Sequence, residues 1–282
     1  MMSRPAVRTG ARRVDLHTHT LFSDGALTPA ALVTRAIERG LSALSITDHD
    51  AIDALDPARD AAGHAIEIVP GIEISCMHDG GELHVLGYFI DPADEKLASR
   101  LVRFREERMQ RALAMVERLA ALGMPVDPER VLELAGPGVI GRPHVAEALV
   151  QAGHVAHMDE AFKRFLGPHG QAFVPRPWFD AKEAIALIHD AGGVSVLAHA
   201  GVAFDEARLE WLSGIGLRGI EIWHPQHGPV AVRRLRGLAA RFDLLETGGS
   251  DFHGPHRGAD VGELPVPASA LQKLKDAAGV PG

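Results

Sequence analysis

The residues of this chain that could do chemistry are histidines and carboxylates grouped in short motifs. His17 and His19 stand two residues apart at the end of a short apolar run, so in an extended strand both imidazoles point to one face. Such a pair is a weak signal alone, because 16 histidines in 282 residues give close pairs by chance. Further motifs accompany it: Ser23-Asp24-Gly25, Thr47-Asp48-His49-Asp50, Glu73, His84, His199 and Ser250-Asp251-Phe252-His253.

Each of these motifs follows or ends a β-like run. In parallel α/β architectures the carboxyl ends of the strands converge on one face, where sites are built. Imidazole and carboxylate donors without thiolates suit zinc, manganese or iron, and one carboxylate can bridge two ions. Nine donors are too many for one ion, so the sequence predicts two or three divalent ions, held by His17, His19, Asp24, His49, Glu73, His84, His199, Asp251 and His253.

A metal cluster of this kind is suited to phosphoester hydrolysis. That reaction needs an activated water and positive charge against the phosphoryl oxygens, and divalent ions provide both.

The elements that must position these motifs alternate between strand and helix. A strand at 14–17 precedes a helix that has Thr28 as N-cap and Pro29 at its first position and ends at Gly40. The apolar patterns predict further strands at 44–47, 66–69, 72–75, 82–89, 194–198, 219–223 and 244–247. They predict further helices at 53–62, 179–191, 206–212 and 230–241.

Between the two alternating blocks the pattern is helical, at 94–122, 128–135, 142–151 and 159–165. Because the donor groups come from both blocks, the two blocks must form one closed barrel. We therefore expect a flexible N-terminal extension at 1–13, a first barrel part at 14–99, a helical insertion at 100–172, and a second barrel part with a C-terminal helix at 173–282.

Composition narrows the possible partners. The net charge of −8 provides no global basic field, so long duplex nucleic acid is not an expected partner. The single cysteine, Cys76, excludes an intramolecular disulfide framework and fits a reducing cytoplasm. No apolar run approaches the roughly 20 residues needed to cross a bilayer, so no membrane association is expected. The oligomeric state is left open.

On these motifs the chain resembles the PHP family, named for polymerase and histidinol phosphatase. The likeness runs from Val14 to about Val261 and includes the helical insertion. It implies an α/β fold, a distorted (β/α)7 TIM-like barrel with up to three ions, Mn²⁺ first and Fe²⁺ or Zn²⁺ as alternatives. One ion would be held by His17, His19, Glu73 and Asp251, a second by Glu73, His84 and His199, and a third by Asp24, His49 and His253.

The resemblance also implies a metal-dependent phosphoesterase, and the helical insertion is similar to that of small bacterial enzymes acting on nucleotides. The first expectation is removal of the 3′-phosphate from a 3′,5′-bisphosphonucleoside, giving a 5′-monophosphate. The alternatives are 5′-to-3′ trimming of short 5′-phosphorylated RNA, a histidinol-phosphatase-like activity, a carbon–nitrogen hydrolase and a non-catalytic binding module.

Gly141-Arg142-Pro143-His144 bears on the substrate. The resemblance implies that Arg142 and His144 grip phosphate, and both an arginine fork and a helix N-terminus favour a dianion. One departure from many relatives is Ala200, which stands where they have proline after the metal histidine.

The remaining candidates carry weaker signals. His227 is a candidate general acid because it is not a predicted ligand. Trp223 could stack on a base, and Glu221 and the His256-Arg257 pair could touch substrate. Asp48 and Asp50 are expected to orient His49 or shape its loop, and Trp178 and Trp211 to lie in the core or an interface.

Overall fold

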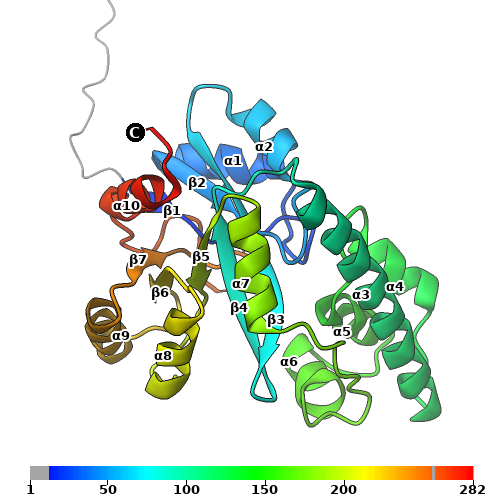
Figure 1. Ribbon diagram of the computed structural model, residues 1–282. Coiled ribbons are helices and arrows are strands. Elements are labelled where there is room, and N and C mark those ends of the chain that lie inside the picture. Colours follow the sequence, from blue (N-terminus) through cyan, green and yellow to red (C-terminus); the bar gives the residue numbers. More distant parts are fainter. Residues whose placement is uncertain (1–12, 256–257, 282) are drawn as a thin grey trace, which may run out of the picture.

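The structure, a computed structural model, describes residues 13–255 and 258–281. Seven strands form one sheet in the order of the sequence, which curls into a nearly closed barrel (Figure 1). All neighbouring pairs are parallel except the two that involve β4. The strands are β1 (Val14–Asp15), β2 (Ala43–Ile46), β3 (Glu67–His78), β4 (Gly81–Tyr88), β5 (Val194–Leu197), β6 (Gly219–Trp223) and β7 (Leu245–Gly248).

The two end strands meet through main-chain hydrogen bonds just beyond β1 and β7. The Leu16 N–H donates to the Gly248 carbonyl at 3.2 Å, and the Asp251 N–H donates to the His17 carbonyl at 2.9 Å. These bonds bring the first and last motifs together although 234 residues separate them in sequence. The predicted distorted (β/α)7 barrel is confirmed.

β3 differs from the prediction, which placed one strand before Pro70-Gly71, at 66–69, and another after it, at 72–75. The chain instead runs as one strand and changes partner at this dipeptide, from parallel pairing with β2 to antiparallel pairing with β4. Pro70 cannot donate a hydrogen bond, but its carbonyl accepts from the Phe89 N–H at 2.8 Å. A Cβ on Gly71 would lie 2.4 Å from the Ser45 Oγ, so only glycine allows the close approach.

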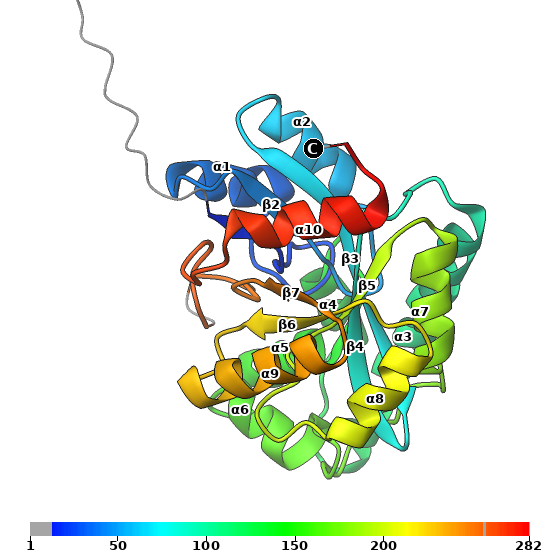
Figure 2. The same cartoon turned by 60° about the vertical axis from the view of Figure 1, so that its left-hand side comes forward.

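Within the described ranges, six of the helices cover the barrel, and Figure 2 shows them from a second side. They are α1 (Pro29–Glu38), α2 (Leu55–Ala62), α7 (Ala181–Asp190), α8 (Glu206–Gly214), α9 (Pro229–Arg241) and α10 (Ala268–Ala278). The Thr28 side chain accepts from the Ala31 N–H, which confirms the predicted N-cap. Cys76 is fully buried in the core between helices and sheet. In the described ranges, every helix is too short or too polar to span a bilayer.

A separate group of helices lies beside the β3–β4 hairpin (Figure 1). It contains α3 (Glu95–Ala121), α4 (Pro128–Ala135), α5 (Arg142–Gln151), α6 (Met158–Ala161) and a π-helical turn, η1 (Phe162–Leu166). α3 belongs to two cores, because Leu97 and Phe104 pack in the barrel core whereas Met115 and Leu119 pack among the helices. The middle of α3 therefore crosses the boundary between barrel and helical group.

Candidate active site

Four predicted donors converge where β1 ends and β7 is followed by its loop. The His17 Nε2 lies 3.1 Å from the His19 Nε2, 3.4 Å from the Glu73 Oε2 and 3.3 Å from the Asp251 Oδ1. The His19 Nε2 lies 3.3 Å from the Glu73 Oε2 and 3.1 Å from the Asp251 Oδ1. His17, His19 and Glu73 are fully buried, so these contacts are shielded from bulk water.

The other oxygen of Glu73 faces a second group. The Glu73 Oε1 lies 2.9 Å from the His84 Nδ1 and 3.0 Å from the His199 Nε2, and the two ring nitrogens are 3.2 Å apart. Glu73 thus has one oxygen toward each group, the arrangement expected of a bridging carboxylate. Glu73 and His84 project from within the long β3–β4 pair, whereas the prediction placed every motif at a strand end.

The third predicted group is present, but its members are shared. The His253 Nε2 lies 3.2 Å from the Asp24 Oδ1, and the His49 Nε2 lies 3.9 Å from the same oxygen. His19 belongs to this group by distance as well, and the His49 Nδ1 is 2.9 Å from the Glu73 Oε2. The structure therefore brings all nine donors into one connected cluster rather than three separate triads.

The donor atoms fit divalent metal ions. Four donors about 2.1 Å from one ion in a tetrahedron stand about 3.4 Å apart, close to the separations around His17 and His19. Among the described residues, the buried Glu73 Oε2 and His49 Nδ1 have no hydrogen-bond partner of acceptable geometry although they are 2.9 Å apart. Buried polar atoms that converge without bonding one another are what an intervening cation would satisfy.

The predicted metal ligands shift one another's pKa values. Burial would raise the pKa of Glu73, but His49, His84 and His17 hold it well below its usual range. Burial would lower the pKa of His84, yet the Glu73 carboxylate raises it to about 10. Burial, together with the neighbouring His253 and His49, lowers the pKa of His19 to about 4. The Glu73 carboxylate therefore stays ionised, and a metal ion would take the place of the proton that His84 holds without it.

Glu221 holds two members of the cluster from behind. It is fully buried, and its carboxylate accepts from the His17 Nδ1–H at 3.0 Å and from the His199 backbone N–H at 2.8 Å. The prediction that Glu221 touches substrate is therefore wrong. A hydrogen bond to one ring nitrogen fixes the tautomer that presents the other to a metal, so Glu221 is a positioning residue.

Asp48 and Asp50 were predicted to orient His49 or shape its loop, and both hold loops beside the cluster. Asp48 accepts from the hydroxyls of Thr20 and Ser23, each at 2.6 Å, and so fixes the loop that carries Asp24. Asp50 ties the His49 loop to β3, because its Oδ1 accepts from the Ser75 N–H at 3.0 Å, and its Oδ2 accepts from Arg108 and Arg176, which sequence reasoning missed.

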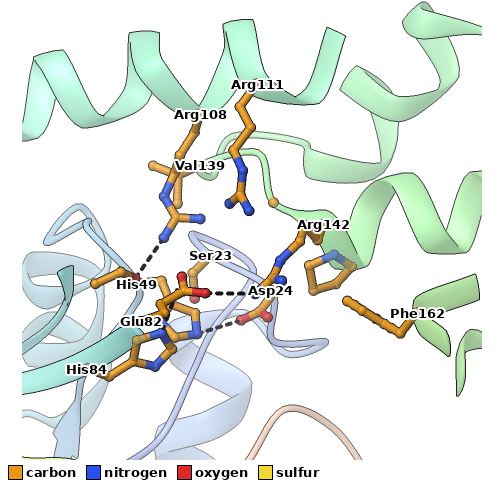
Figure 3. A pocket seen from close by; sticks show the side chains of 13 residues that line it. Ser23, Asp24, His49, Glu82, His84, Arg108, Arg111, Val139, Arg142 and Phe162 are labelled. Atoms are coloured by element: carbon orange, nitrogen blue, oxygen red, sulfur yellow. Dashed lines mark hydrogen bonds and ion pairs between the residues drawn. The ribbon is translucent and has the colours of Figure 1, made fainter. Parts of the chain in front are cut away.

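Arg108 and two further arginines line a pocket that opens onto the metal-donor cluster (Figure 3). We call it the arginine pocket and define it by Arg108 and Arg111 of α3 and Arg142 of α5. Val139, Pro143 and Phe162 of the helical group cover it, and its inner wall is shared with the cluster through Asp24, His49 and His84.

The charges around this pocket are unevenly paired. Asp50 accepts from the Arg108 Nε at 2.8 Å and from the Arg176 Nη2 at 3.2 Å, and Glu82 pairs with Arg142 at 3.2 Å. Arg111 is nearly buried and donates only from Nε, to the Val174 carbonyl; among the described residues no carboxylate pairs with it. Burial, with Arg142 nearby, lowers the pKa of Arg111 to about 9.

Of the predicted phosphate pair, the structure brings only Arg142 to the pocket wall. His144 is not among the lining residues; its Nδ1 accepts from the Gly141 N–H at 3.0 Å, which caps the start of α5.

His227 is unsuited to the role of general acid. Its Nδ1 donates to the Ile222 carbonyl and its Nε2 accepts from the Gly201 N–H, each at 3.0 Å. Both ring nitrogens are therefore engaged by backbone, and burial lowers the pKa of this imidazole.

The tryptophans also differ from expectation. Trp223 packs against the barrel core with Arg236 of α9 5.8 Å from its ring, so it faces α9 and is not among the residues lining the arginine pocket. Trp178 and Trp211 are 59% and 37% exposed, so neither lies in the core, and their place in an interface stays a prediction; Trp211 stacks on His78. The predicted substrate contact at His256-Arg257 lies outside the described residues.

Comparison with known proteins agrees with this geometry. The PHP domain family matches residues 15–191. The chain is 37% identical over 265 residues to 5'-3' exoribonuclease Rnm of Escherichia coli, with 90% of each chain covered. It is 35% identical over 258 residues to the 3',5'-nucleoside bisphosphate phosphatase of Chromobacterium violaceum, covering 88% of this chain and 90% of that protein.

A solved structure extends the likeness to three dimensions. A candidate metal-dependent phosphoesterase from Bifidobacterium adolescentis matches with a TM-score of 0.89 at 34% identity, over 96% of this chain and 98% of that one. These matches confirm the predicted hydrolase of phosphoric esters. With the family match, the relatives and the barrel in agreement, the chain belongs to the PHP family.

Proposed function

We propose that this protein hydrolyses the 3′-phosphate of nucleoside 3′,5′-bisphosphates and releases a nucleoside 5′-monophosphate and inorganic phosphate. One observation carries the proposal: the arginine pocket opens directly onto the metal-donor cluster and shares Asp24, His49 and His84 with it. A substrate with two phosphates can place one at the cluster and the other beside Arg108 and Arg111. The 35% identical bisphosphate phosphatase supports this choice of substrate.

The cluster would bind two or three divalent ions, Mn²⁺ first, with Fe²⁺ or Zn²⁺ also compatible with a nitrogen and oxygen donor set. When bound, such ions polarise a phosphate ester and favour attack by water. The proposed ligands are those predicted from the sequence: His17, His19, Asp24, His49, Glu73, His84, His199, Asp251 and His253.

The chain's own residues would then hold and orient the substrate. Arg142 lies at the start of α5, where its guanidinium and the helix N-terminus both favour a phosphate dianion. Arg108 and Arg111 would hold the 5′-phosphate, and Glu221 keeps the His17 Nε2 aimed at the cluster. In the reaction a bond forms between a water oxygen and phosphorus, the bond to the 3′-oxygen breaks, and that oxygen takes up a proton.

A second substrate is compatible with the same site, namely short RNA with a 5′-phosphate. The first phosphodiester of such an RNA is also attached to the 3′-oxygen of a nucleotide that carries a 5′-phosphate. The arginine pocket would hold the terminal phosphate, and each turnover would release one 5′-mononucleotide. The 37% identical exoribonuclease supports this alternative.

The test is a comparison of four substrates with the Mn²⁺-loaded protein: adenosine 3′,5′-bisphosphate, adenosine 3′-monophosphate, a 5′-phosphorylated tetraribonucleotide and histidinol phosphate. We expect the bisphosphate to exceed the 3′-monophosphate in kcat/KM by about a hundredfold, because charge-assisted hydrogen bonds to the 5′-phosphate are lost in the latter. Preference for histidinol phosphate, or equal use of the two adenosine compounds, would contradict the proposal.

A further inference from the structure

A second depression leaves the metal-donor cluster on the side away from α3. Its far wall is formed by Phe204 and Arg208, and its near wall by Glu82, His84 and Arg142, which also line the arginine pocket. Leu83, Ala198, His199 and Ala200 form the remainder. We call it the Phe204–Arg208 groove. Since it shares three residues with the arginine pocket and includes His199 of the cluster, the two spaces meet at the proposed reaction site.

The far wall of the groove combines a cation with an aromatic ring. The Arg208 guanidinium carbon lies 5.7 Å from the centre of the Phe204 ring. Arg208 donates to the His78 carbonyl, but its buried Nε has no hydrogen-bond partner within the described ranges. No carboxylate there forms an ion pair with it either, so its charge is not neutralised by the protein.

Two stacked aromatic rings, those of His78 and Trp211, lie next to Arg208. The His78 and Trp211 rings are 3.8 Å apart and 13° from parallel, and 37% of Trp211 is exposed. His78 belongs to β3, whereas Trp211 and Arg208 both belong to α8, which lies beside the β3–β4 hairpin (Figure 2). Arginine interleaved with aromatic rings is the composition of surfaces that bind single-stranded nucleic acid.

We propose that the Phe204–Arg208 groove binds the nucleotide that follows the scissile phosphate in a single-stranded RNA. Its base would stack on the Phe204 ring, and its 3′-phosphate would pair with Arg208. This inference rests on the proposed function, because the RNA must place its 5′-phosphate in the arginine pocket and its first phosphodiester at the cluster. The helical group covers the pocket, so the rest of the strand has to leave along another path, and the groove begins at the cluster.

A bisphosphate substrate ends at the cluster and does not reach the groove. Binding of the RNA should therefore depend on Phe204 and Arg208, whereas turnover of the bisphosphate should not. Ala200, with its small side chain, leaves room for a nucleotide at the mouth of the groove.

The experiment measures binding of a 5′-phosphorylated, 3′-fluorescein tetraribonucleotide to the Mn²⁺-loaded protein by fluorescence anisotropy, with the bridging 3′-oxygen of the first linkage replaced by a methylene group so that cleavage cannot occur. We expect Arg208→Ala to weaken binding about tenfold and to reduce the slope of log K against log salt by about 0.7, the value for one phosphate contact on a single strand. Phe204→Ala should weaken binding about five- to tenfold and leave the slope unchanged, because it removes stacking only. Arg208→Lys should keep the slope.

Turnover of adenosine 3′,5′-bisphosphate by the Mn²⁺-loaded variants serves as the fold check and should stay within about twofold of the parent protein. The matched control is Arg218→Ala, which removes an exposed arginine just before β6, on the wall of a different depression. It should change neither measurement.

The outcomes separate the groove from the proposed function. Unchanged RNA binding in Arg208→Ala and Phe204→Ala, or an equal loss of RNA binding and bisphosphate turnover, overturns the groove proposal. If the parent protein hydrolyses neither substrate while RNA binding still depends on Arg208, the groove stands and the proposed function fails.

Discussion

The two walls of the site differ in how their charges are compensated. On the barrel wall, the predicted metal-donor carboxylates of Asp24, Glu73 and Asp251 each lie against several imidazoles; Glu73 alone contacts five of them. On the opposite wall, Arg108, Arg142 and Arg176 share the carboxylates of Asp50 and Glu82, and Arg111 pairs with neither. Among the described residues, the first wall contains buried atoms of Glu73 and His49 without a hydrogen-bond partner, and the second contains a nearly buried arginine without a carboxylate, Arg111.

This difference indicates two kinds of bound partner. A cation would satisfy the Glu73 and His49 atoms that lack a hydrogen-bond partner, and an anion would satisfy the Arg111 guanidinium. The barrel wall thus lacks a cation and the arginine wall lacks an anion, as expected for an enzyme that holds metal ions on one wall and phosphate on the other. Changes to one wall should leave the function of the other intact, and the following predictions test that separation.

The largest effect is expected from Glu73→Gln on the barrel wall. The amide keeps the shape but removes the charge that faces both halves of the cluster, so metal binding and turnover should fail together. We expect kcat/KM for the bisphosphate to fall by about a thousandfold or more, with reduced metal content measured by plasma mass spectrometry. Full metal content with normal turnover would remove Glu73 from the ligand set.

Next in size is Asp50→Asn, which acts on the arginine wall. The change leaves Arg108 and Arg176 buried without their shared carboxylate, and loss of one partner of a buried pair costs about 3 kcal/mol or more. Urea unfolding should show this loss of stability, while metal content stays near that of the parent. An unchanged urea midpoint would mean that Asp50 does not anchor these arginines.

A smaller and more selective effect is expected from Arg111→Met. The apolar chain fills similar space but cannot bind phosphate, so kcat/KM should fall about a hundredfold for the bisphosphate and less than about threefold for the 3′-monophosphate. Stability should stay equal or rise by about 1 kcal/mol, because a buried charge without a carboxylate is removed.

The control for Arg111→Met is Arg103→Met, which alters an exposed arginine on the same helix. It should leave kcat/KM unchanged for both the bisphosphate and the 3′-monophosphate. If Arg111→Met slows both adenosine compounds equally, Arg111 does not contact the 5′-phosphate.

The two walls also differ in how far sequence could predict them. Donors on the barrel wall occur in short motifs beside apolar runs, and the barrel brings those runs together. Local signals were equally effective for α4 and α5, where Pro128 and Pro143 stand near the helix starts and the predicted bounds match the observed ones. β3 was divided incorrectly because Pro70-Gly71 reads as a turn, although here it marks a change of strand partner.

The arginine wall depends on packing between distant elements, which no short motif encodes. Only Arg142 was predicted, and Arg108, Arg111 and Arg176 were missed. A signal was present nonetheless: positions 104, 108, 111 and 115 share one face of α3, and two of them are arginines among the buried Phe104 and Met115. Arginines within an apolar stripe indicate side chains that are buried and bind a charged partner. Only the fold reveals that these arginines lie beside the metal-donor cluster.

The smallest effect is expected from a residue that lies near the cluster but belongs to neither wall. His227 was predicted as a general acid, and removal of a true general acid slows an enzyme by about a hundred- to ten-thousandfold. In the structure both ring nitrogens hold backbone groups, at Ile222 and Gly201, which leaves no proton for a leaving group. His227→Gln can still donate and accept one hydrogen bond each, so kcat should fall less than about threefold, at a stability cost of about 1 kcal/mol. A hundredfold loss in kcat with unchanged thermal unfolding would contradict this prediction. It would show that His227 is the general acid that protonates the 3′-oxygen.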